Sequence, residues 1–285
     1  MQAEQSLYST YRRLVTQLMH DQEQLPSLPN ITLEIRRALN DDTISISALV
    51  GLISRDPGLS ALLMKHASSP LYRQVQAPKT LNDVVNQLGL REVGRITMLH
   101  SVKSLFTLHS AAHKNLFLEA WERLINKAST SAMLARLVGR ISAEHALLAS
   151  LLSEVGSLTV LSGFKSAEEI PSKALYEKLC REYGKSLGVI VLKKWAVDDE
   201  YIEITRETGN WFYTKGNTLQ VIDVVNLALH HIAQGRASED ELPSLEELPA
   251  WKKLPPPLNE IDDDGTLKLL SSHQHDIQLL AQSLR

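Results

Sequence analysis

The sequence predicts an all-α protein, and three observations favour that fold class. Apolar residues recur at intervals of three and four along most of the chain, which is the period of a helix with one buried face. Helix start and stop signals border several of these periodic segments. No segment alternates apolar and polar residues as a half-buried strand does. At a typical length of about 12 residues, roughly a dozen helices fit in the chain.

The first helices are predicted from two apolar stripes and one cap. The stripes fall in residues 31–39 and 46–53, where Ile, Leu, Val and Ala share one helical face. Asp56 is followed by Pro57, which is typical of an N-cap and a first helical position, because the carboxylate accepts a free N–H and proline lacks one. We therefore expect a helix from Pro57 onward.

The next helices are predicted from a capping box and a glycine. Thr80 and Asp83 resemble a capping box, with aspartate in place of the usual Glu or Gln. Their helix should end near Gly89, since glycine readily adopts the conformation that ends helices. A long helix should begin near Arg91. Apolar stripes predict further helices around Trp121, Leu152, Tyr176 and Val224, and over residues 274–284.

Composition shifts along the chain predict a two-lobed helical bundle with a C-terminal extension. The polar stretch 108–115 separates an N-terminal lobe over 1–115 from a second helical lobe over 116–235. Beyond it, residues 236–285 begin with an acidic segment and contain three consecutive prolines, which cannot continue a helix. A final helix closes this extension.

Charge and cysteine content restrict the class of function. Hydrophobic residues make up 44%, charged residues 22%, and the formal net charge is −3. That balance gives no overall excess of positive charge that would attract nucleic acid or an acidic membrane. We therefore expect neither as a partner. No stretch approaches the roughly 20 apolar residues of a membrane helix, and the N-terminus does not resemble a secretory signal. A single cysteine, Cys180, fits a reducing setting, and we predict a cytoplasmic protein.

The histidines and the cysteine of the chain do not form a motif with known chemistry. His109 and His113 have the spacing of a helical metal site, but the general-base glutamate of that motif is absent, which favours surface histidines. His230 and His231 are adjacent and would point about 100° apart on a helix, so we expect one to be partly buried and the other exposed. Cys180 lies in an apolar stripe without a paired base, which favours a structural role.

One acidic turn invites a calcium-loop interpretation. A loop that begins at Glu260 would place oxygen ligands at its first positions and Gly265 at the sixth. Its twelfth position is Ser271, where a bidentate glutamate is required, so an exposed acidic turn is favoured. The chain has no phosphate-binding glycine loop and no nucleophile elbow. Residue chemistry alone therefore predicts no catalytic residues, no metal and no cofactor.

The N-terminal half resembles the HDOD domain family. Leu25–Pro29 before an amphipathic helix is similar to the opening of that domain, and Leu52–Leu59 is similar to its "ISRDP-x-L" core. Ala67–Tyr72 follows, with a serine where the family often has Asn, and Leu81–Leu90 is similar to the segment "hxxAVxxLGL". Matches in this order over Leu25–Thr97 make the resemblance specific.

The HDOD resemblance implies a second lobe like the HD-type phosphohydrolases, which hold metals with histidines and aspartates. Leu151–Gly156 is similar to the HD segment "LLHDIG", with Ser153 in place of the His and Glu154 in place of the Asp. Lys127 falls at or near the first His position. Lysine repels a cation and serine is a weak neutral ligand, so these exchanges weaken a metal centre.

The remaining ligand positions of the HD pattern differ as well. Glu207 and Thr208 fall where a His-His pair occurs in some members, and Asn226 falls at the distant Asp. Two carboxylates without imidazoles do not rebuild the centre, so the resemblance implies a catalytically inactive relative. Two interpretations of the remnant stay open: a structural Lys127–Glu154 ion pair with Asn226 hydrogen-bonded nearby, or a pocket of these six residues that binds a small ligand or a side chain of a partner protein.

We therefore expect a non-catalytic bacterial signal-transduction module. It would act through contacts with other signalling proteins in trans or with a second copy of itself. The Leu- and Pro-containing segment of the C-terminal extension and the groove between the lobes are the docking surfaces that the sequence favours.

Two other function classes remain as alternatives. The first is a divergent metal-dependent phosphohydrolase, which would combine carboxylates with histidines from this list: Glu154, Glu207, His109, His113, His230 and His231. The second is a nucleotide-sensing module, whose basic residues would come from this list: Lys127, Lys193, Lys194 and Arg206. Both require side chains that are distant in the sequence to converge.

Overall fold

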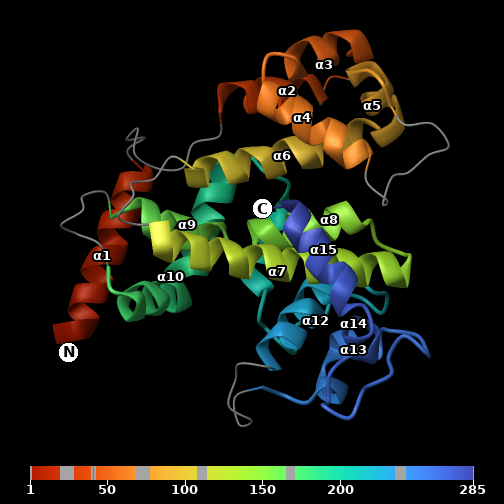
Figure 1. Ribbon diagram of the computed structural model, residues 1–285. Helices are drawn as coiled ribbons and strands as arrows, with labels where there is room; N and C mark the ends of the chain where they lie inside the picture. Colours follow the sequence, from red (N-terminus) through yellow and green to blue (C-terminus); the bar gives the residue numbers. More distant parts are fainter. Residues whose placement is uncertain are drawn as a thin grey trace. The chain divides into compact units, whose positions relative to one another are not determined.

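Figure 1 shows the computed structural model of the chain, which is built from helices. The structure describes residues 2–19, 29–39, 41, 43–68, 78–107, 114–164, 171–234 and 242–284. Within these ranges there is no β-strand, only one isolated β-bridge between Ile261 and Leu267. The predicted all-α fold class is confirmed.

Contacts along the chain define two compact units. One unit is Ser27–Leu108, and the other combines Met1–Pro26 with His109–Arg285. The boundaries predicted at residues 115 and 235 stay predictions. The contact-based division differs from them in placing the first helix with the C-terminal part of the chain.

The described residues of the smaller unit form five helices around an apolar core. The helix-start predictions are confirmed, because the carboxylate of Asp56 accepts from the Leu59 N–H at 2.9 Å and Thr80 forms a capping box with Asp83. Gly89 ends its helix with φ of 78°, a left-handed conformation that suits glycine. The helices are α2 (Asn30–Leu39), α3 (Ile46–Ile53), α4 (Pro57–Ala67), α5 (Leu81–Leu88) and α6 (Leu90–Thr107).

The larger unit contains the remaining helices. These are α1 (Gln2–Met19), α7 (Lys114–Val138), α8 (Ala143–Leu152), α9 (Val155–Ser162), α10 (Lys173–Lys194), α11 (Asp199–Glu207), α12 (Val221–Gln234), α13 (Pro249–Lys252), α14 (Lys268–Ser271) and α15 (Gln274–Leu284), with a 3₁₀ turn at Leu245–Glu247. Helix α1 packs on α10, where the rings of Tyr11 and Tyr183 stack with centroids 4.3 Å apart.

Helices α9 and α10 cross at short range because of glycine. A Cβ atom on Gly156 would lie 1.8 Å from the carbonyl oxygen of Gly184, so a larger residue cannot fit without moving the backbone. Gly188 of α10 lies on the other side of the same crossing. The glycine of the HD-like segment therefore has a packing role here, which fixes the α8–α9 junction against α10.

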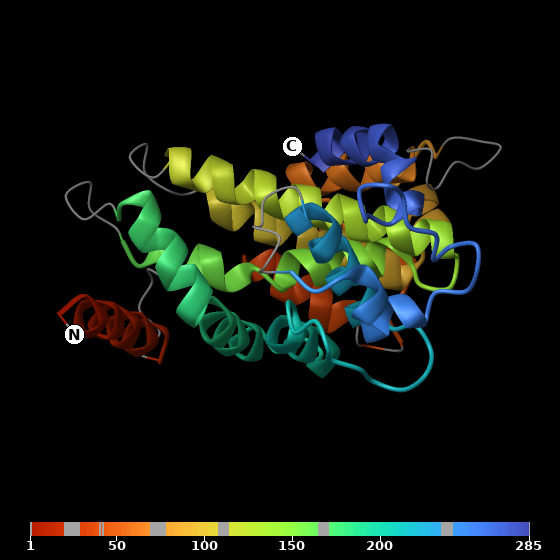
Figure 2. The same ribbon diagram turned by 90° about the horizontal axis from the view of Figure 1, so that it is seen from below.

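The C-terminal segment belongs to the core of the larger unit. In both views it lies against α7 and α12 (Figures 1 and 2). Leu245, Leu248 and Leu254 are buried in one apolar cluster with Leu134 of α7 and Val224 of α12. These three leucines are therefore used inside the chain and are not available to a partner, while a docking role of the rest of the segment stays a prediction.

Among the described residues, Ala143–Ser162 has the length and hydropathy of a membrane-crossing segment, contrary to the expectation that no stretch approaches one. It comprises α8 and α9, and 89% of the window is buried inside the protein. That burial is typical of core helices. The cytoplasmic location stays a prediction.

Candidate functional site

The HD-like segment forms the sharp junction between α8 and α9. Ser153 ends α8 as its C-cap, and Glu154 occupies the N-cap position of α9. The Ser153 hydroxyl donates to the Ser150 carbonyl at 2.7 Å, which fixes its rotamer. The junction thereby directs both side chains toward α7.

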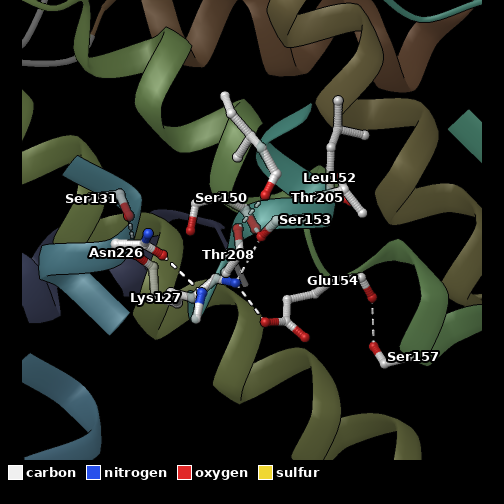
Figure 3. A network of polar contacts seen from close by, with 12 residues as sticks. Lys127, Ser131, Ser150, Leu152, Ser153, Glu154, Ser157, Thr205, Thr208 and Asn226 are labelled. Atoms are coloured by element: carbon white, nitrogen blue, oxygen red, sulfur yellow. Dashed lines mark hydrogen bonds and ion pairs between the residues drawn. The ribbon is translucent and has the colours of Figure 1, made fainter. Parts of the chain in front are cut away.

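Lys127 of α7 meets both side chains (Figure 3). Its Nζ donates to Ser153 Oγ at 2.8 Å and to Glu154 Oε1 at 2.5 Å. The lysine side chain is 4% exposed and the glutamate side chain is 37% exposed. A buried ammonium is costly without a partner, so this contact is what permits the lysine to be there. The predicted Lys127–Glu154 ion pair is confirmed.

The other three sequence-predicted residues come from α11 and α12. Asn226 is buried, accepts from the Gly209 N–H at 2.8 Å and donates to the Asn210 carbonyl at 3.4 Å, so it holds the turn after α11. The buried Thr208 hydroxyl donates to a carbonyl one turn earlier in its own helix. Figure 3 shows Thr208 and Asn226 in the same polar region as Lys127. The Glu207 carboxylate instead accepts from the Asn210 amide at 2.9 Å.

These residues do not fit the divalent metal that the HD resemblance implies. Of the residues that Figure 3 labels, Glu154 is the one carboxylate, and Lys127 is bonded to it. A site for Zn²⁺, Mn²⁺ or Mg²⁺ needs three or more anionic or imidazole ligands around one point. No group of three His, Cys, Asp or Glu side chains with that arrangement exists within the described residues. His109 and His113 lie outside the described residues.

The adjacent histidines lie on α12 and have separate surroundings. His230 is fully buried and its Nε2 is 2.8 Å from the Pro243 carbonyl oxygen, while His231 is half-buried. The expectation of one partly buried and one exposed histidine is therefore wrong, because the C-terminal segment covers this part of α12. Burial lowers the pKa of both imidazoles below the usual value.

The acidic turn near the C-terminus uses its oxygens internally. The Asp262 carboxylate accepts from the Thr266 N–H and hydroxyl and from the Ser271 hydroxyl. These hydrogen bonds, led by that of Ser271, lower the pKa of Asp262 to about 2. The turn closes on itself, in agreement with the interpretation that the sequence favoured.

A cavity of about 400 Å³ opens beside the Lys127–Glu154 pair. It is lined by Arg123, Leu124, Lys127, Glu154, Ser157, Glu177, Cys180, Arg181, Leu229 and Ile232. Sequence reasoning missed the two arginines, although Arg123 lies one helical turn before Lys127 and would share its face. Three basic residues proposed from sequence for nucleotide sensing, Lys193, Lys194 and Arg206, are not part of the lining.

Burial raises the pKa of the Cys180 thiol to about 12, so this cysteine is largely protonated at neutral pH.

The family model of the HDOD domain matches residues 25–210. The chain belongs to the HDOD family. The matched HDOD region contains the whole smaller unit from Ser27 onward, together with Lys127, Ser153 and Glu154. Asn226 and the C-terminal segment lie beyond it.

Solved structures share the helical fold of this HDOD protein. A proposed metal-dependent phosphohydrolase from Shewanella amazonensis SB2B matches with a TM-score of 0.77 at 20% identity, over 100% of both chains. An HDOD domain protein of unknown function from Geobacter sulfurreducens matches with a TM-score of 0.65 at 19% identity, over 97% of each chain. These likenesses confirm the predicted HD-like fold and do not extend to activity.

A curated relative extends beyond the matched region. An uncharacterized protein of Treponema pallidum (strain Nichols) is 24% identical over 200 residues. The match covers 65% of this HDOD chain and 37% of the relative.

Proposed function

We propose that this HDOD protein is a non-catalytic bacterial regulatory module that acts through contacts with other signalling proteins in trans. The observation that carries the proposal is the bond of the Lys127 ammonium to Ser153 and Glu154. These two residues stand at the positions that resemble the His-Asp pair of the HD-type hydrolases. A fixed internal cation is thus bonded to the residues that resemble the metal ligands of the hydrolases.

Electrostatics argue against a metal ion beside this ammonium. Two positive charges a few ångströms apart repel each other strongly in a partly buried place. Displacing Lys127 from Glu154 would leave a buried ammonium without an anion, which is unfavourable by several kcal/mol. The metal-dependent phosphohydrolase alternative requires a metal ion beside this ammonium and the displacement of Lys127 from Glu154. The lysine therefore favours a regulatory role over catalysis.

Metal analysis joined to activity assays tests the catalytic part of the proposal. Purified protein is incubated with Mn²⁺, Zn²⁺, Fe²⁺ or Mg²⁺, desalted, analysed for metal, and assayed on phosphate monoesters and diesters. We expect less than stoichiometric metal and no turnover in the natural sequence, in Glu154→Gln and in the control Glu177→Gln. Stoichiometric metal with turnover that Glu154→Gln abolishes and Glu177→Gln retains would overturn the proposal.

Genetic complementation tests the regulatory part. The double variant Lys127→Met/Glu154→Leu removes the charges of the pair together and keeps side chains of similar size, so it should fold. Expressed in a strain that lacks the gene, it should restore any deletion phenotype as well as the natural sequence does. Failure to do so at normal protein level, with a folded protein, would contradict a role that depends on contacts alone.

The kind of partner can be narrowed by the oligomeric state. Light scattering on the purified chain distinguishes a monomer, which requires a different protein as partner, from a dimer, in which a second copy fills that role. Both results fit the proposed function, and they direct the search for partners differently.

A further inference from the structure

The cavity beside the ion pair is lined by four helices of the larger unit. Helix α7 contributes Arg123 and Leu124, α9 contributes Ser157, α10 contributes Cys180 and Arg181, and α12 contributes aliphatic side chains. Its volume, about 400 Å³, is in the range of small-molecule sites. The ten described residues of the lining belong to one compact unit.

The charges that line this cavity are not balanced. Lys127 and Glu154 neutralise each other through their ion pair. Of the three remaining charged residues, two are arginines and one is a glutamate, so the lining has an excess of one positive charge. Neither Arg123 nor Arg181 forms a hydrogen bond or an ion pair with any described residue. Two guanidinium groups therefore have donors available for an anion.

Part of the cavity lining is aliphatic. It consists of Leu124 of α7 and Leu229 and Ile232 of α12, and no aromatic side chain among the described residues belongs to the lining. Leu124 is buried, while Leu229 and Ile232 are partly exposed. Apolar surface that a ligand can cover favours a ligand with a hydrocarbon part, because its removal from water is favourable.

We propose that this cavity binds a small organic anion whose carboxylate or phosphate group is held by Arg123 and Arg181 and whose aliphatic body packs on Leu124, Leu229 and Ile232. The inference rests on the proposed function in one respect, which is that the anion would be the signal that the module reports. Binding itself does not depend on that role.

Calorimetric titration of the full chain tests the ligand class. Four probes separate its parts: octyl phosphate and octanoate carry both charge and hydrocarbon, inorganic phosphate carries charge alone, and octanol carries hydrocarbon alone. We expect saturable one-to-one binding of octyl phosphate, octanoate or both, at least tenfold tighter than either inorganic phosphate or octanol. The stronger of the two amphiphiles identifies the headgroup. Absence of binding by both amphiphiles would overturn the proposal, and so would equal affinity for octanol.

Charge-removing variants locate the site. Arg123→Gln and Arg181→Gln should each weaken binding of the preferred amphiphile by about tenfold or more, since a hydrogen bond between two charged groups is stronger than one between neutral groups. Lys185→Gln is the matched control, because Lys185 is exposed on α10 one turn after Arg181 and does not line the cavity. Equal binding by all three variants, with unchanged circular dichroism, would place the anion elsewhere.

The single cysteine provides an independent readout in the natural sequence. Cys180 lines the cavity, so a bound amphiphile should slow its modification by N-ethylmaleimide at least several-fold, as followed by intact mass. An unchanged rate at saturating ligand would contradict binding in this cavity. Catalytic turnover would overturn the proposed function but leave these binding results intact, so the two proposals fail on different measurements.

Discussion

Two lysine–carboxylate pairs in the larger unit have the same chemistry and different surroundings. Lys253 of the C-terminal segment bonds both oxygens of Asp223 on α12, at 2.9 and 3.0 Å, and the two side chains are 7% and 1% exposed. Lys127 is equally buried, but its partner Glu154 is 37% exposed and borders a cavity. One pair is enclosed on all sides, and the other has an open side.

The enclosed pair is saturated by its neighbours. Asp223 Oδ2 also accepts from the Gln220 N–H at 2.7 Å, and Lys253 also reaches the Lys215 carbonyl at 3.4 Å. Glu154 uses Oε1 for Lys127, and its second oxygen has no partner in the described part of the chain. The first pair therefore fastens the C-terminal segment to α12, whereas the second leaves bonding capacity at a cavity wall.

Breaking the enclosed pair should have the largest effect. Asp223→Asn leaves the Lys253 ammonium buried without an anion, and we expect the free energy of unfolding to fall by about 3–5 kcal/mol in urea denaturation. Glu246→Gln, an exposed carboxylate of the same segment, is the control and should change it by less than about 0.5 kcal/mol. The double variant Asp223→Leu/Lys253→Met should recover most of the loss. A fall below 1 kcal/mol in the single variant would show that the pair does not fasten the segment.

Breaking the open pair should have a smaller effect. Glu154→Gln is expected to lower the free energy of unfolding by about 1–3 kcal/mol, between the values for surface and buried pairs, because water reaches the carboxylate. Glu177→Gln, which removes a carboxylate of the same cavity, should change it by less than about 0.5 kcal/mol. Equal losses for Glu154→Gln and Asp223→Asn would remove the distinction between the two pairs.

Local signals in the sequence predicted much of the fold. The proline after Asp56 and the aspartate three positions after Thr80 predict two helix caps, and both are confirmed. The Lys127–Glu154 pair followed from the alignment of both residues with one HD-like centre. The sequence therefore predicts those features that depend on neighbours in the chain or on a shared family pattern.

Features that depend on tertiary packing were not predicted. The burial of Leu245 and Leu254 depends on how the C-terminal segment meets α7 and α12, and nothing in its local pattern indicates that contact. The Arg123–Arg181 cavity unites residues from two helices 58 positions apart. A basic residue is a surface residue by default, so the sequence provides no reason to place these two together.

A change of pH should have the smallest effect of the three on the stability of the larger unit. His230 and His231 lie on the same helix as Asp223, and burial lowers the pKa of both below the usual 6.5. At these two histidines the unfolded chain takes up protons at a higher pH than the folded chain does, so their contribution to stability is fully present above about pH 6.5 and decreases as the pH falls. We expect a lower urea midpoint at pH 5.5 than at pH 7.5. The pKa of Asp262 is lowered to about 2, so its contribution to stability is lost only below its usual 3.8 and does not enter this pH range.

His231→Asn should reduce the pH dependence of the urea midpoint, whereas His275→Gln, at an exposed position, should not. A midpoint that stays constant or rises toward pH 5.5 would show that the end of α12 accepts protonated histidine in the folded chain.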